Sequence, residues 1–148
     1  MIALGCDHGG YDLMQAVIAY LDREGIAYKN LGCENNHDSV DYPDYGRKVV
    51  KAILSGECEK GIVICGTGIG VSIAANKVKG AYAALLSDVY SAQRARLSND
   101  ANIACMGAFT TGCKERELMV DAFLGNEFVP GCSSQPKVDA FVKYDRER

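Results

Sequence analysis

The chain lacks several features that would place it in common protein classes. Tryptophan is absent, prolines number only 3 among 148 residues, and no apolar run approaches the roughly 20 residues needed to span a bilayer. No Cys-x-x-Cys pair is present, and the two histidines, His8 and His37, are far apart, which argues against a structural zinc site. The net charge of −3 is spread over both signs. We therefore expect neither nucleic acid nor a membrane as a partner.

The cysteines do not fit a disulfide framework. There are 7 of them, an odd number, and the first residues reach Asp7 without the basic region of a signal peptide. We therefore expect a cytoplasmic protein with reduced thiols. All the cysteines except Cys65 are interpreted as small buried or incidental residues, namely Cys6, Cys33, Cys58, Cys105, Cys113 and Cys132.

What the chain does have is a regular alternation of apolar strand-like runs with segments of helical periodicity. Strands are predicted at residues 2–6, 26–31, 62–65, 81–86 and 102–106. Helical faces recur near residues 13–21, 49–54, 88–97, 118–123 and 138–142. This alternation predicts one α/β domain over residues 1–148, with a five-stranded parallel sheet covered by helices on both faces.

The most informative segment begins with the apolar run that ends at Cys65. Glycines follow at positions 66, 68 and 70, and a helical segment is predicted from Ser72 to Lys77. A helix N-terminus offers unpaired N–H groups to a phosphate, an oxyanion or a thiolate. The segment is not a P-loop, because the Gly-Lys-Ser/Thr ending is missing, and Val71 stands where a dinucleotide fingerprint needs glycine. A structural turn and an anion cradle remain equal alternatives.

Polar residues also follow the other predicted strands, and ligands of parallel sheets bind beyond the carboxyl ends of the strands. Asp7 and His8 follow the first strand and precede a glycine pair. They suit proton transfer, although Asp7 equally suits a helix N-cap and His8 a surface position. Residues 41–45, Asp-Tyr-Pro-Asp-Tyr, are predicted to form an ordered turn over the site. Residues 98–102 read as a turn first and a substrate contact second.

The motifs are more specific in combination than singly. Gly-Cys-Asp-His-Gly-Gly, Asp-Tyr-Pro, Ile-Cys-Gly-Thr-Gly-Ile-Gly, Ala-Ala-Asn-Lys and Asn-Asp-Ala-Asn occur in one order. From residue 1 to about residue 124 the chain resembles the ribose-5-phosphate isomerase B family, whose relatives include galactose-6-phosphate isomerase. The resemblance implies a Rossmann-like three-layer α/β/α domain that interconverts aldose and ketose phosphates without a metal or organic cofactor. It also implies homodimers or tetramers with shared active sites, in which residues 130–148 pack on the partner subunit.

The resemblance also assigns roles to residues of this chain. Cys65 takes the place of the base that moves a proton between C2 and C1 through an enediolate, and Val71 stands where some relatives have a glutamate base. Thr67 matches a hydroxyl residue near the reacting oxygens. The remaining matched positions are the enediolate-stabilising amides and the substrate contacts, namely Gly66, Gly68 and Gly70 for the former and Asp7, His8, Tyr42 and Asn99 for the latter.

The chain departs from the family where the sugar ring is opened and where the phosphate is held. Ser98 replaces the histidine thought to open the ring, and Phe109 replaces a common arginine. Of two further arginine positions, one is Cys132 and the other is Pro136, or Lys137 after a one-residue insertion. Lys137 is therefore the predicted phosphate ligand, together with His8. Ribose 5-phosphate is the leading substrate, and the alternatives are a hexose 6-phosphate or another sugar, a non-catalytic sugar-phosphate-binding subunit, and a nucleotide-binding module.

Overall fold

The computed structural model describes residues 1–148 and contains one parallel sheet with the strand order β2-β1-β3-β5-β4. The predicted five-stranded α/β architecture is confirmed. The strands are β1 (Ile2–Cys6), β2 (Tyr28–Asn30), β3 (Lys60–Cys65), β4 (Ala83–Leu85) and β5 (Ile103–Gly107).

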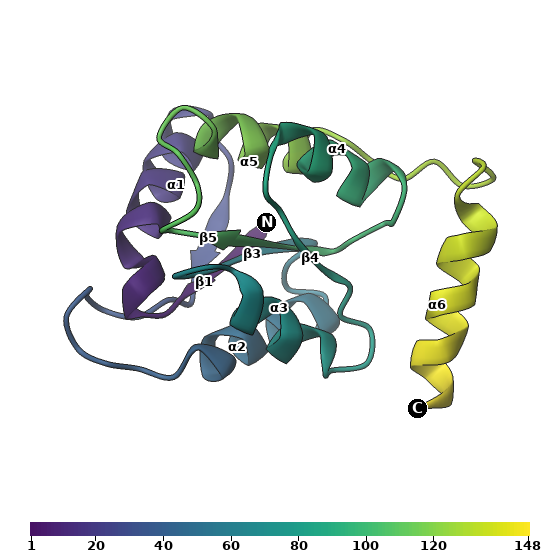
Figure 1. The fold of residues 1–148 in the computed structure, drawn as a ribbon, viewed down its shortest axis with the longest axis horizontal. Helices are drawn as coiled ribbons and strands as arrows, with labels where there is room; N and C mark the ends of the chain where they lie inside the picture. Colours follow the sequence, from purple (N-terminus) through teal and green to yellow (C-terminus); the bar gives the residue numbers. More distant parts are fainter.

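Helices cover both faces of the sheet (Figure 1). On one face lie α1 (Tyr11–Arg23), α4 (Val89–Leu97) and α5 (Arg116–Leu124), and on the other lie α2 (Tyr42–Leu54) and α3 (Ile69–Asn76). Every residue of β1, β3 and β5 is buried because these strands lie between two layers of helices. Successive side chains of β3 alternate, so Ile64 packs toward α1 and Cys65 toward α2 and α3.

The two edge strands are shorter than predicted. The run 26–31 forms a strand only over Tyr28–Asn30, and the run 81–86 only over Ala83–Leu85. An edge strand has a hydrogen-bonded neighbour on one side alone, so its ends are held less firmly than those of an inner strand. β3 extends the other way and starts at Lys60.

Two helix starts also differ from the predictions. Tyr42 is the first residue of α2, so the predicted turn over residues 41–45 is wrong. Pro43 stands in the first helical turn, where its missing N–H is not needed. α3 begins at Ile69 rather than Ser72, because Gly68 adopts a φ of 78° and acts as the N-cap. The helix therefore starts inside the glycine-rich turn.

The last helix, α6 (Gln135–Glu147), stands to one side of the α/β body (Figure 1). It contacts its own chain beside edge strand β4, where the ring centroids of Tyr82 and Phe141 lie 5.4 Å apart. The Asp145 carboxylate accepts hydrogen bonds from the Gly80 N–H at 2.8 Å and the Tyr82 hydroxyl at 3.1 Å. Packing of residues 130–148 on a partner subunit stays a prediction. No helix of the chain has both the length and the apolar character needed to cross a membrane.

Candidate active site at the carboxyl ends of the strands

Cys65 is the last residue of β3 and is only 4% exposed. The backbone N–H of Gly68 donates a hydrogen bond to its sulfur at 3.1 Å. This bond depends on the left-handed conformation of Gly68, which folds the chain back over the strand end. An N–H donor at the start of a helix stabilises a thiolate more than a thiol, so this position suits a cysteine that acts as a base.

Gly66 follows Cys65 in the chain, and its amide N–H donates to no acceptor within the chain. It faces the end of β1, where a Cβ placed on Gly9 would lie 3.5 Å from the Gly66 nitrogen. The ends of β1 and β3 come together because Gly10 has no side chain, since a Cβ there would lie 2.4 Å from the Ile64 oxygen. A free amide fixed in this way is a donor for negative charge that develops on a substrate oxygen.

Asp7 and His8 lie at the adjacent end of β1. One oxygen of the buried Asp7 carboxylate accepts the Gly10 N–H at 2.9 Å, so the N-cap interpretation is correct for that oxygen. The other oxygen, Oδ2, has no partner in the chain. His8 Nδ1 accepts the Val40 N–H at 3.2 Å. In the neutral ring the proton is then on Nε2, which leaves a directed donor.

Side chains from three separate segments pack against the three glycines of the turn: Phe109 after β5, Leu85 at the end of β4 and Tyr42 at the start of α2. A Cβ on Gly66 would lie 2.8 Å from the Phe109 ring, and one on Gly68 would lie 2.7 Å from Leu85. A Cβ on Gly70 would likewise lie 2.6 Å from the Tyr42 ring. The sequence analysis found Tyr42 but missed Leu85, and it treated Phe109 only as a departure from the family. The available signal was position, because both follow or end a strand at the edge where Cys65 lies.

Thr67 is exposed at the tip of the turn, where its hydroxyl oxygen accepts the Ile69 N–H at 3.2 Å. This bond fixes the hydroxyl at the mouth of the site and caps the start of α3. The structure thus brings together most of the predicted site residues at one edge of the sheet, namely Asp7, His8, Tyr42, Cys65, Gly66, Thr67, Gly68 and Gly70.

Asn99 does not belong to this group. It precedes β5, whereas Cys65 pairs with Gly107 at the other end of that strand. The four residue steps between Ile103 and Gly107 span about 13 Å. Asn99 instead lines a hollow of about 270 Å³ together with Tyr82 and Phe141.

Lys137 lies in the first turn of α6, one helical turn before Phe141, and so on the side of the molecule where Asn99 lies. The predicted site residues therefore form two separate groups within one chain.

The two arginines before Ser98 differ sharply in their surroundings. Arg96 is buried, and its guanidinium pairs with Glu127 at 2.7 Å and with Asp100 at 3.0 Å. Arg94 bonds through Nε to the Ser98 hydroxyl at 2.8 Å and forms no ion pair. Arg96 is therefore a structural residue, while Arg94 carries an uncompensated charge beside Ser98.

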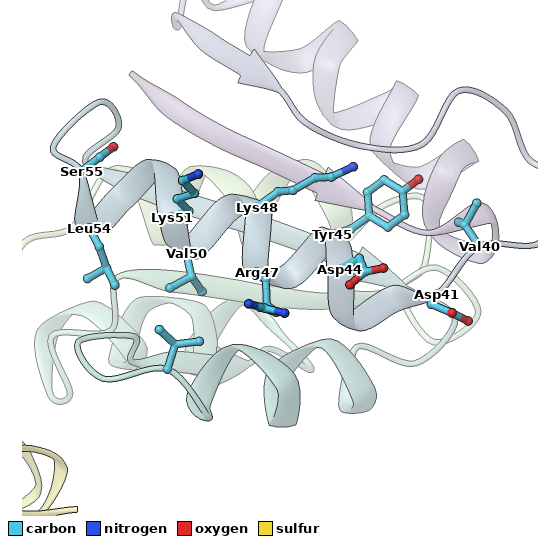
Figure 2. Close-up of a pocket in the computed structure, with 11 residues that line it drawn as sticks. Val40, Asp41, Asp44, Tyr45, Arg47, Lys48, Val50, Lys51, Leu54 and Ser55 are labelled. Carbon is cyan, nitrogen blue, oxygen red and sulfur yellow. The ribbon is translucent and has the colours of Figure 1, made fainter.

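A concave region of about 890 Å³ runs along α2 (Figure 2). Figure 2 shows Arg47, Val50 and Leu54 along one side of this helix. The groove contains no predicted site residue and reaches the site only at Val40 and Asp41. We place the candidate active site at the strand ends because the Cys65 thiol, the His8 imidazole and the free Gly66 amide all lie at this edge of the sheet. No group of three or more His, Cys, Asp or Glu side chains in the chain is arranged to hold a metal ion.

Comparison with known proteins decides the family. The family described as Ribose/Galactose Isomerase matches residues 2–141. The chain belongs to this family. It is 42% identical to the ribose-5-P isomerase B of Listeria innocua serovar 6a over 146 residues, which cover 99% of this chain and 97% of that protein. The solved structure of ribose-5-phosphate isomerase B from Clostridium thermocellum superposes with a TM-score of 0.93 at 42% identity, covering 99% and 97% of the two chains.

A third relative carries a different name. The D-erythrulose-4-phosphate isomerase of Pectobacterium atrosepticum is 38% identical over 146 residues, covering 99% of this chain and 95% of that protein. Membership of this family makes the chain a sugar-phosphate isomerase, and the Rossmann-like fold is the one shared with its structural relatives.

Proposed function

We propose that this chain interconverts ribose 5-phosphate and ribulose 5-phosphate through an enediolate, with Cys65 as the base. The observation that carries the proposal is the Cys65 sulfur, held by the Gly68 N–H beside the free N–H of Gly66. The name of the Listeria relative supports the choice of substrate.

The reaction follows from this geometry. The thiolate removes the proton from C2 of the open-chain aldose, and negative charge moves to the carbonyl oxygen on C1. The Gly66 amide and the first amides of α3 stabilise that charge, because they are fixed before the reaction begins. A proton then moves from the hydroxyl on C2 to the oxygen on C1, the thiol returns its proton to C1, and the ketose leaves. Thr67, Asp7 and His8 bind the sugar hydroxyls around the reacting carbons, and Tyr42 closes one side.

We further propose that the site is completed by a second copy of this chain. Asn99, Lys137 and Arg94 do not lie at the edge of the sheet where Cys65 lies, so within one subunit they contact no substrate held by Cys65. A symmetric homodimer brings the Asn99 side of one subunit to the Cys65 side of the other, twice. The partner then supplies Lys137 and Arg94 as positive charge for the phosphate.

A four-carbon sugar phosphate is the second candidate substrate, and Ser98 is the residue that favours it. Ribose 5-phosphate closes into a furanose through O4, so its isomerase must also move protons to open the ring. A four-carbon aldose with its phosphate on O4 has no hydroxyl in that position and stays open. A serine at the ring-opening place is sufficient for such a substrate, and the Pectobacterium relative is named for its ketose.

Deuterium exchange tests both candidates in one experiment. The protein is incubated in deuterated water with ribose 5-phosphate, erythrose 4-phosphate and galactose 6-phosphate, and loss of the C2 proton is followed by NMR. We expect exchange and ketose formation with ribose 5-phosphate, and none with the Cys65→Ala variant. Exchange confined to erythrose 4-phosphate would select the second candidate. No exchange with any aldose phosphate, despite binding, would identify a non-catalytic subunit and overturn the proposal.

A further inference from the structure

Two cysteines that are far apart in the sequence meet beside the active site. The sulfurs of Cys6 and Cys33 lie 3.7 Å apart, in van der Waals contact. Their backbones are also joined, because the Cys33 N–H donates to the Cys6 carbonyl at 3.1 Å. Cys6 is fully buried and Cys33 is 7% exposed. No other pair of thiols in the chain is in such contact.

We propose that Cys6 and Cys33 are a modification site, at which a hydroperoxide converts the two thiols into a reversible disulfide that lowers the activity of the adjacent site. The backbone already holds the two residues as neighbours, and the sulfurs have to close only from 3.7 Å to the bonding distance of about 2.05 Å.

Oxidation of the two thiols consumes one hydroperoxide. The Cys33 thiolate attacks one peroxide oxygen, the O–O bond breaks, and an alcohol leaves with a sulfenic acid on Cys33. The sulfur of Cys6 then attacks the Cys33 sulfur and expels water. The two thiols lose two electrons and two protons, and the hydroperoxide becomes an alcohol and water. Burial raises the pKa of Cys6 to about 12, so the more exposed Cys33 reacts first and the second step is slow.

The position of the pair connects it to catalysis. Cys6 directly precedes Asp7 at the end of β1. Cys33 stands at the start of the segment that leads to Val40, whose N–H holds His8, and then to Tyr42, whose ring covers Gly70. Cys6 lies in a buried inner strand paired with β3, so we expect bond formation to displace the segment after Cys33. The Cys33 thiol also gives up its hydrogen bond to the Asn35 carbonyl at 3.2 Å.

Peptide mapping tests the bond itself. The protein is treated with hydrogen peroxide, free thiols are alkylated, and the unreduced sample is cleaved with trypsin. Each sulfur lies in a separate peptide without another cysteine, residues 1–23 and residues 30–47. We expect these two peptides joined as one species that is lost after treatment with a thiol reductant. Cys58 is also buried but has no thiol in contact, so its peptide, residues 52–60, serves as the control and is expected to remain fully alkylated.

Activity measurements test whether the disulfide lowers catalysis. This effect rests on the proposed function, whereas formation of the disulfide does not. A displacement of about an ångström near reacting groups costs up to a hundredfold. We expect the kcat of the oxidised protein to fall about tenfold or more and to recover with the reductant. The Cys33→Ser variant should keep its activity in peroxide over the same period. An equal, irreversible loss in Cys33→Ser would assign the effect to Cys65 and overturn the functional link. Absence of the joined peptide from the folded protein would overturn the site.

If the reduced protein isomerises no sugar phosphate, the proposed function fails while the mapping still decides the bond. A thermal melt gives a second measurement. The disulfide closes a loop between residues 27 positions apart, so oxidation should raise Tm in the wild type and not in Cys33→Ser.

Discussion

The backbone N–H of Gly68 donates a hydrogen bond to the sulfur of Cys65 across 3.1 Å, from three residues further along the chain. This contact joins the end of β3 to the start of α3 and directs an N–H donor at the sulfur. A lone pair on a negative sulfur accepts such a bond better than a thiol does. The same turn leaves the Gly66 N–H without a hydrogen-bond partner within the chain.

Replacing Cys65 with alanine should abolish isomerisation and leave the fold intact. Loss of a general base typically costs about a hundred- to ten-thousand-fold. We expect kcat to fall by that factor, with substrate binding retained in calorimetry. Cys65→Ser should also bind and turn over poorly, because a hydroxyl is a much weaker acid than a thiol. Cys58→Ala, at a buried cysteine outside the site, is the matched control, and near-normal turnover by Cys65→Ala would refute the assignment.

Mixing two inactive variants should restore activity if the site is shared. One chain carries Cys65→Ala and the other carries Asn99→Ala, so a mixed dimer contains one site with both residues intact. After subunit exchange, random pairing should return about a quarter of the wild-type activity. Mass spectrometry of the intact assembly verifies the exchange. A verified mixed dimer without activity would exclude the pairing, and so would an active monomer detected by light scattering.

Binding of the substrate phosphate should depend on Lys137 and Arg94 but not on Arg96. Lys137→Ala and Arg94→Ala should each raise KM several-fold with a smaller effect on kcat, since they remove binding that is equal in the ground and transition states. The Arg94 guanidinium offers a planar fork with no competing carboxylate, so its loss should have the larger effect. Arg96→Ala should instead lower Tm. An unchanged KM in both variants would move the phosphate elsewhere.

Installing a histidine at position 98 should separate the two candidate substrates. Ser98→His supplies an imidazole that can move protons between the ring oxygen and O1 of a cyclic sugar. We expect turnover of ribose 5-phosphate to rise several-fold and turnover of erythrose 4-phosphate to stay the same or fall. Ser98→Asn, which has a similar size and no titratable group, is the control. An equal change for both sugars would show that ring opening does not limit the reaction.

Acid should weaken the ion pairs that Glu127 forms with Lys60, the first residue of β3, and with Arg96. Hydrogen bonds from Lys60 and Arg96 hold the pKa of Glu127 below its ordinary value of 4.5. Because the folded-state pKa is depressed, the stabilisation is present above the ordinary value and is lost as the pH falls through the folded value. Glu127→Gln should therefore lower Tm near neutral pH, and this difference should shrink as the pH drops below about 4. A pH-independent difference would show that the charge is not responsible.

The strand pattern and the glycine-rich turn were readable from the sequence because each is a local feature. The apolar runs of β1 and β5 are buried on both faces and keep their predicted length in the structure, with β5 shifted by one residue. The ends of the edge strands and the starts of α2 and α3 were predicted less well. They depend on whether a neighbour is present and on the φ of Gly68, which no local pattern specifies.

The sequence by itself determined the fold class, the family and the group of residues that follow β1 and β3, because these properties depend on periodicity and on short motifs. Only the tertiary structure decided that Asn99 lies away from Cys65. It also decided that carboxylates neutralise Arg96 but not Arg94. The packing of Phe109 and Leu85 against the glycine-rich turn was likewise visible only in the structure. The tertiary structure also brought Cys6 and Cys33 into contact across 27 positions of sequence. Such relationships arise from packing between segments distant in the chain, and composition and spacing along one segment carry no information about them.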